Sequence, residues 1–172
     1  MKYSHLKQKS QHSTKDIELL DKVKQSLRLV TNPVNVITTQ SQSKTISGIT
    51  VNSVTSLSMD PILLTFNVKL PSHFSAQLHQ TQYCAINTLT TNQKSIAQFF
   101  SKPGHGEFDD SQNHFSWLDS IPYLNKSLAT FLCKVKHVFP VADHEVWVVQ
   151  VIEVASGDNH DTGLLYRNQK YI

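Results

Sequence analysis

The sequence predicts a mainly β protein, a barrel or sandwich with a few peripheral helices. Runs rich in β-branched residues recur at fairly regular spacing and are separated by polar turns, as in all-β folds. Strand and helix alternate only twice, which argues against a doubly wound parallel sheet. The strand-like runs are residues 34–39, 46–52, 62–68, 83–89, 130–138, 145–154 and 164–167.

The chain's 172 residues suffice for one domain with a sizeable core and are few for two. We expect residues 1–13, which are mostly Lys, His, Gln and Ser, to form a disordered tail, and residues 14–172 to form the domain. No apolar run approaches the length of a membrane span. The formal net charge is +3 and the basic residues are spread along the chain, which argues against a nucleic-acid partner.

The two cysteines favour an intracellular, cytoplasmic protein. Cys84 and Cys133 both fall in apolar strand-like runs, so we expect buried, unreactive thiols in a reducing compartment. The tail lacks acidic residues, as organelle-targeting segments do, but it also lacks Arg and a clear apolar face. The mitochondrial matrix or another organelle is therefore the alternative location.

Three helices are expected around the strands. Ser13 and Asp16 have the spacing of a capping box, and apolar residues then recur at helical spacing as far as Leu27. We expect this first helix to pack against the outside of the barrel. Residues 101–128 form a long irregular stretch of the kind that often lies over a site. The other two helices are expected at residues 72–80 and 92–100.

The most unusual segment is residues 47–61, in which small hydroxyls and amides are interleaved with apolar residues. On a strand, Thr50 and Asn52 share one face, and Val51 and Ser53 share the other. Such groups at a strand end suit a phosphate or the edge of a heteroaromatic ring. The alternative interpretation is a Ser/Thr-rich exposed edge strand followed by a turn.

With its neighbours, this segment resembles the flavin reductase domain family. Members typically show a proline and a hydrophobic strand ending in Thr-Thr, then Gly-x-Thr-x-Asn-Ser or a similar motif. A Ser-x-Ser-x-Asp-Pro turn and an apolar strand follow, and all of these stand here in that order. The resemblance covers residues 27–172. The matching segments are residues 33–39, 48–53, 56–61, 85–89, 96–101, 143–154 and 164–171.

The resemblance implies an FMN-binding split β-barrel that works as a homodimer, with the flavin near the subunit interface. FMN is the implied cofactor, with FAD as the alternative, and NADH or NADPH is a transient substrate. A lysine charge and the N-terminus of a helix both favour an anion, whereas Lys69 taken without the resemblance reads as a solvated loop lysine. By position, the implied flavin-lining residues are Thr50, Val51, Asn52 and Ser53, and those for the phosphate are Lys69 and Ser72.

The resemblance also places His144 on the side from which nicotinamide or substrate approaches the flavin; the alternative is a surface or structural histidine. No catalytic side chain is expected, because the isoalloxazine carries the chemistry. No metal site is expected either, because the other histidines show no ligand spacing with carboxylates or thiols. A Gly-x-Ser-x-Gly elbow and a Gly-rich dinucleotide fingerprint are both absent from the sequence.

Three departures from the family pattern bear on flavin binding. His73 stands where members often carry Arg, which removes a permanent bidentate phosphate partner. Ala142 replaces the Gly before Asp-His, and Glu107 stands where many members have Arg. These residues bear on tight binding and on turnover with a nicotinamide, while the fold prediction is unaffected.

The predicted function is therefore an NAD(P)H-dependent flavin reductase, an oxidoreductase that passes electrons on or releases reduced flavin to a partner oxygenase or larger assembly. The main alternative is a non-catalytic flavin-binding or cofactor-free accessory subunit of a larger complex. A third interpretation is a pyridoxamine-phosphate-oxidase-like or haem-binding relative of the same barrel.

Overall fold

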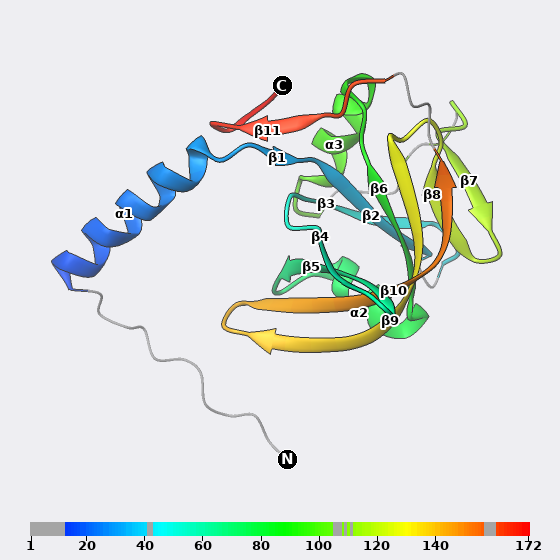
Figure 1. The fold of residues 1–172 in the computed structure, drawn as a ribbon, viewed down its shortest axis with the longest axis horizontal. Helices are drawn as coiled ribbons and strands as arrows, with labels where there is room; N and C mark the ends of the chain where they lie inside the picture. Colours follow the sequence, from blue (N-terminus) through cyan, green and yellow to red (C-terminus); the bar gives the residue numbers. More distant parts are fainter. Residues whose placement is uncertain (1–12, 41–42, 105–107, 109, 111, 157–160) are drawn as a thin grey trace, which may run out of the picture.

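The computed structural model describes residues 13–40, 43–104, 108, 110, 112–156 and 161–172. The predicted tail thus lies outside the described residues, except for Ser13. Figure 1 shows a curled sheet from which helix α1 leads away. No helix in the described residues is both long and apolar enough to cross a membrane. The helices are α1 (Thr14–Leu29), α2 (His73–Thr81), a 3-10 turn η1 (Thr91–Gln93) and α3 (Lys94–Phe100).

The strands form one large antiparallel sheet and two small ones. The large sheet has seven strands in the order β3-β2-β6-β9-β10-β5-β4, a three-stranded sheet has the order β1-β11-β12, and β7 pairs with β8. The strands are β1 (Asn32–Pro33), β2 (Asn35–Gln40), β3 (Ile46–Val51), β4 (Thr55–Met59), β5 (Ile62–Lys69), β6 (Tyr83–Thr88), β7 (Phe115–Leu118), β8 (Ile121–Leu124), β9 (Ala129–Val141), β10 (His144–Ser156), β11 (Leu165–Arg167) and β12 (Lys170–Tyr171).

The large sheet curls because its two edge strands are consecutive in the chain. β3 and β4 stand at opposite edges of the strand order, yet only residues 52–54 join them. The sheet must therefore bend round until its edges meet. At that corner the backbone N–H of Asn67 on β5 donates to the Ser53 hydroxyl at 3.0 Å. The predicted mainly β fold with peripheral helices is confirmed.

Strand β2 separates two apolar clusters, because alternate side chains point to opposite faces of a strand. Ile37 packs inside the curled sheet with Phe66 and Trp147. Val36 faces the other way, into a cluster that includes Phe100 of α3. Every residue of β2 except the last is buried, so both of its faces are covered. The strand that pairs with β3 is therefore held rigidly on both sides.

The predicted strands are all present, with ends that shift by up to three residues. The structure adds β4 within the segment expected to be a turn. This strand is largely exposed and pairs only with β5, as the alternative interpretation of a Ser/Thr-rich edge strand required. A hairpin, β7 and β8, lies within the stretch predicted to be irregular, residues 101–128.

The helices form where the capping residues indicate. Ser13 and Asp16 make the predicted capping box of α1, and Ser72 caps α2. The expected packing of α1 against the barrel is wrong, because none of its residues is buried. Within the described residues the apolar face of α1 stays exposed, and the C-terminal end of the helix is held by the Asn168 backbone N–H, which donates to the Arg28 carbonyl at 2.7 Å.

The two cysteines are buried and lie opposite each other on β6 and β9, as free thiols. A hydrogen bond between them, together with burial, raises the pKa of the Cys84 thiol well above its ordinary value. The predicted burial is confirmed. The raised pKa disfavours the thiolate, the reactive form, so low reactivity remains our prediction.

Gly48 on β3 lies against the Phe100 ring of α3. A Cβ at this position would come within 2.7 Å of Phe100 Cε1 and 3.3 Å of the Ile37 carbonyl oxygen. The absence of a side chain therefore lets α3 pack closely on β3. This contact sets the position of the strand that ends in Thr50 and Val51.

Replacing Gly48 with alanine should lower the free energy of unfolding by about 1–3 kcal/mol, because the new methyl group overlaps the Phe100 ring. Gly163→Ala is the matched control, since its Cβ would meet only Leu128 Cδ2, at 3.1 Å, at the end of a flexible side chain. Urea unfolding of both variants measures the difference. Equal losses in the two variants would contradict the close packing of α3 on β3.

Candidate functional site

A cavity of about 320 Å³ opens where β3 ends. The end of β3 and the residue after it supply Thr50, Val51 and Asn52 to its wall, and the C-terminal hairpin supplies Tyr166 and Tyr171. Three of the four residues predicted to line the flavin are thus brought together in one cavity. Its remaining lining residues are Val34, Ser101 and Gln169.

The wall formed by β3 is fixed by its neighbours on both sides. Val51 pairs with Asn35 of β2, and the Thr50 hydroxyl donates to the Ala97 carbonyl of α3 at 2.7 Å. Strand β2 on one side and helix α3 on the other therefore fix the position of the end of β3. A preformed wall of this kind limits the entropy lost on binding a rigid ring.

The opposite wall comes from the C-terminus of the chain. Strand β11 pairs with β1, which places Tyr166 opposite Asn32, and β12 folds back on β11 so that Tyr171 lies opposite Tyr166. The two tyrosine rings are 5.2 Å apart in a T-shaped contact. Burial raises the pKa of Tyr171, which outweighs the opposing effect of its hydrogen bond with Ser101. Tyr171 is thus a neutral, partly buried aromatic group.

The fourth predicted flavin-lining residue, Ser53, does not line the cavity. Its hydroxyl accepts the Asn67 N–H and so ties the corner between β3 and β4 to β5. Ser53 therefore positions the end of β3. The sequence contains no local signal of this contact, because Ser53 lies in the loop between β3 and β4 and Asn67 lies on β5.

Lys69 and His144 pair with each other across β5 and β10. Between their side chains lies Asp143, with one carboxylate oxygen 3.7 Å from Lys69 Nζ and the other 2.7 Å from His144 Nδ1. The hydrogen bond with His144, aided weakly by the charge on Lys69, lowers the pKa of Asp143. This exposed triplet stands at the β9–β10 turn, where Ala142 has a φ of 52°, a conformation that favours glycine.

Ser72 caps α2 by accepting the Ser75 N–H at 3.2 Å. None of Lys69, Ser72 and His144 lines the cavity at the end of β3. The structure therefore separates the predicted site residues into two groups, one at the cavity wall and one at the start of α2 and the neighbouring turn. The assignment of the second group to phosphate and nicotinamide stays a prediction.

Beside that second group, a nearly buried carboxylate joins α2 to β10. Glu145 accepts a hydrogen bond from the Ser75 hydroxyl, and its other oxygen lies 3.0 Å from His79 Nε2. Burial raises the pKa of Glu145, but the bonds from Ser75 and His79 outweigh it, so the net pKa is lowered. Glu145 therefore fixes the orientation of α2, whose first turn is the predicted phosphate site.

Five lining residues of the cavity are absent from the predicted site: Val34, Ser101, Tyr166, Gln169 and Tyr171. A sequence signal was present for the two tyrosines, because both lie in residues 164–171, one of the segments that carry the family resemblance. What the sequence lacks is the pairing of β11 with β1 that carries these residues across to the end of β3. Glu107 lies outside the described residues, so its predicted effect on binding is untested.

The cavity fits a flat heteroaromatic ring. Ligand cavities of about 300–1,000 Å³ are usually apolar with a few polar groups that fix orientation, and this one combines two valines and two tyrosines with the polar groups of Asn52 and Gln169. Within the described residues no cluster of three His, Cys, Asp or Glu side chains could hold a metal ion.

Comparison with known proteins identifies the family of this chain. The family model of the flavin reductase like domain matches residues 27–172. This chain belongs to the flavin reductase-like domain family. A NADH-dependent flavin reductase of Rhodococcus sp is 25% identical over 129 residues, which are 74% of this chain and 72% of that protein. A NADH:FMN oxidoreductase of Rhodococcus qingshengii is 28% identical over 142 residues, 80% of this chain and 73% of that protein.

The solved structures agree with the family assignment. The styrene monooxygenase flavin reductase of Pseudomonas putida S12 superposes with a TM-score of 0.78 at 25% identity, covering 88% of this chain and 96% of that one. The resemblance predicted from the sequence is therefore confirmed. In this flavin reductase-like chain, the family's Gly-x-Thr-x-Asn-Ser motif corresponds to the wall of the cavity and the corner beside it.

Proposed function

We propose that this chain uses NADH to reduce FMN held in the cavity at the end of β3, and that it releases the reduced flavin to a separate oxygenase. The predicted activity, NAD(P)H-dependent reduction of flavin, is confirmed by the family membership and by relatives named NADH-dependent flavin reductase and NADH:FMN oxidoreductase. The observation that carries the proposal is the cavity formed by the family's own motif.

A bound FMN would supply the hydride-accepting ring, so the chain itself need only bind and orient. Residues 50–52 present strand-end amides and the Asn52 side chain to the polar edge of the ring. Tyr166 and Tyr171 offer aromatic surface that excludes water from it. Thr50 acts chiefly through position, since its hydroxyl donates to Ala97.

The FMN phosphate is assigned to Lys69 and the Ser72-capped start of α2. Ser53 holds Asn67 to the corner that ends β3, and Lys69 follows Asn67 by two residues on β5. The side chain of Lys69 is 72% exposed, and the one ion pair it makes with a described residue is the long contact to Asp143, so it can turn towards an anion. The helix dipole at the start of α2 adds to this attraction.

Lys69→Ala should lower the affinity for FMN by about tenfold. The affinity for riboflavin, which lacks the phosphate, should be unchanged. The factor lies at the low end for a charged hydrogen bond because solvent screens so exposed a lysine. Quenching of flavin fluorescence measures both affinities, and Lys136→Ala, at an exposed position of β9, is the matched control. Equal losses of affinity for FMN and for riboflavin would mean that Lys69 acts through the fold.

The second part of the proposal is a homodimer formed through α1. This helix carries an apolar stripe that none of the described residues buries: Ile17, Leu20, Val23 and Leu27 are each 44–63% exposed. Further large apolar side chains are exposed on the large sheet, and we take them as the surface that α1 covers: Leu57 and Met59 of β4, Ile62 of β5, Phe139 of β9 and Ile152 and Val154 of β10. Exposed apolar side chains that lie together mark protein–protein interfaces.

A symmetric dimer in which α1 of each protomer covers this surface on its partner buries both stripes at once. Leu20→Glu should therefore convert the dimer to a monomer in sedimentation velocity runs, because it places a charge in the buried stripe. Gln25→Glu introduces the same charge on the opposite face of α1 and should leave the dimer intact. A wild-type monomer, or dissociation by both variants alike, would contradict the interface.

The oxygenase partner is supported by one of the similar structures, which is the flavin reductase of styrene monooxygenase. Steady-state oxidation of NADH with added FMN tests the activity, and the same assay with NADPH tests the preference. Turnover that is unaffected by free FMN concentration would mean a permanently held flavin and would contradict release of the reduced flavin to an oxygenase.

A further inference from the structure

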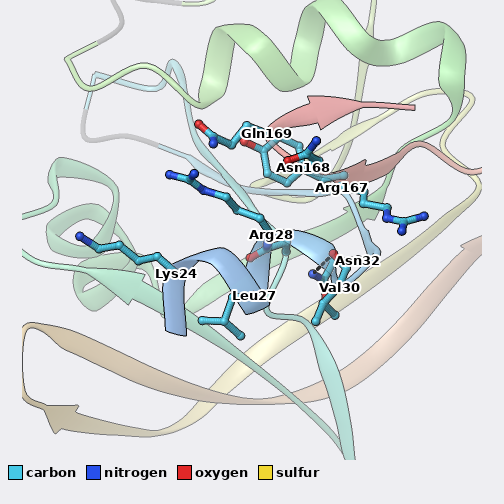
Figure 2. Close-up of a pocket in the computed structure, with 10 residues that line it drawn as sticks. Lys24, Leu27, Arg28, Val30, Asn32, Arg167, Asn168 and Gln169 are labelled. Carbon is cyan, nitrogen blue, oxygen red and sulfur yellow. Dashed lines mark hydrogen bonds between the residues drawn. The ribbon is translucent and has the colours of Figure 1, made fainter. Parts of the chain in front are cut away.

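A second cavity, of about 260 Å³, adjoins the first. It lies between the last turn of α1 and the turn that joins β11 to β12, as Figure 2 shows. Asn52, Tyr166 and Gln169 line both cavities, so the two open into neighbouring space. A ligand that places a ring in the first cavity can therefore extend into the second.

Three cations line the second cavity: Lys24 and Arg28 of α1, and Arg167 of β11. Its described lining contains no Asp or Glu. None of the ion pairs among the described residues involves any of the three cations. In Figure 2, Lys24 and Arg28 extend in the same direction from α1, and Arg167 extends to the other side. The three cations thus point to two sides, Lys24 with Arg28 and Arg167 apart from them.

Hydrogen bonds hold both the side chain and the backbone of Arg28 in place. With the Gln169 amide turned so that its oxygen faces Arg28, that oxygen accepts from Nε at 2.9 Å and from Nη1 at 3.3 Å. The Arg28 carbonyl accepts the Asn168 N–H at 2.7 Å, which fixes the backbone as well. Two like charges four residues apart, Lys24 and Arg28, destabilise a helix unless an anion compensates them. This arrangement is typical of an anion site.

We infer that this cavity binds the diphosphate of NADH, whose nicotinamide then reaches the flavin ring in the adjoining cavity. Guanidinium groups bind phosphate oxygens through paired N–H donors, and the amides of Asn32, Asn52 and Asn168 around them suit ribose hydroxyls. FMN ends in a single phosphate, which we assign elsewhere, to Lys69 and α2. Because the first phosphate of FAD is that same group, FAD does not supply this diphosphate, and the inference rests on the proposed function for the ring alone.

The test compares Arg28→Ala with Lys22→Ala, which removes the same charge from α1 at a residue outside the cavity. Calorimetric titration with ADP-ribose, which carries the diphosphate without a nicotinamide or flavin ring, measures the cavity directly. Arg28→Ala should lower the affinity for ADP-ribose by about ten- to a hundredfold, and Lys22→Ala should leave it unchanged. Sedimentation of both variants checks that the oligomeric state is unchanged.

Kinetics and flavin titrations then test whether the diphosphate is that of NADH. Arg28→Ala should raise the KM for NADH with FMN as the flavin, while kcat and the FMN-to-FAD affinity ratio stay unchanged. A wild-type protein that binds ADP-ribose but no riboflavin would remove the proposed flavin site and leave this one standing.

Three outcomes overturn the inference. The first is unchanged ADP-ribose binding in Arg28→Ala. The second is an equal loss in Lys22→Ala, which would show a general effect of net charge on the protein's field. The third is a lower affinity of Arg28→Ala for FMN with an unchanged affinity for riboflavin, which would place the FMN phosphate in this cavity.

Discussion

The corner between β3 and β4 is the constraint on which the rest of the structure depends. Because residues 52–54 alone join the two edges of a seven-stranded sheet, the sheet has to curl, and the Ser53–Asn67 hydrogen bond locks the closure. The curl frees the end of β3 from further pairing and leaves its peptide groups facing the C-terminal hairpin. The cavity at the end of β3 is thus a consequence of how the sheet closes.

The residues that line the cavity come from the ends of strands, while their supports come from the core. Gly48 lets α3 pack on β3, and the buried strand β2 holds β3 from the other side. The polar groups of residues 50–52 are therefore fixed before any ligand arrives. In flavin chemistry this is the main contribution that the protein can make, since the ring supplies the reactivity and the protein supplies position and a dry surface.

The sequence was sufficient for seven of the strands and for the wall of the cavity formed by β3, because both rest on local patterns. Alternating β-branched residues predict strands such as β2, and the family motif includes Thr50 and Asn52. Contacts between distant residues could not be read in the same way. Strand β4 depends on pairing with β5, and the hydroxyl of Ser53 is taken by Asn67. An amphipathic helix likewise indicates that α1 needs a partner surface without saying which chain provides it.

The central claim is that the cavity between the end of β3 and the C-terminal hairpin holds the isoalloxazine ring. Asn52 lines this cavity and is exposed, so Asn52→Trp should fill it while the protein remains folded with an unchanged Tm. Titration with riboflavin isolates the ring from any phosphate contact. We expect the variant to lose riboflavin affinity by at least about tenfold relative to the wild type. Riboflavin binding that is equally tight in both proteins would contradict the account.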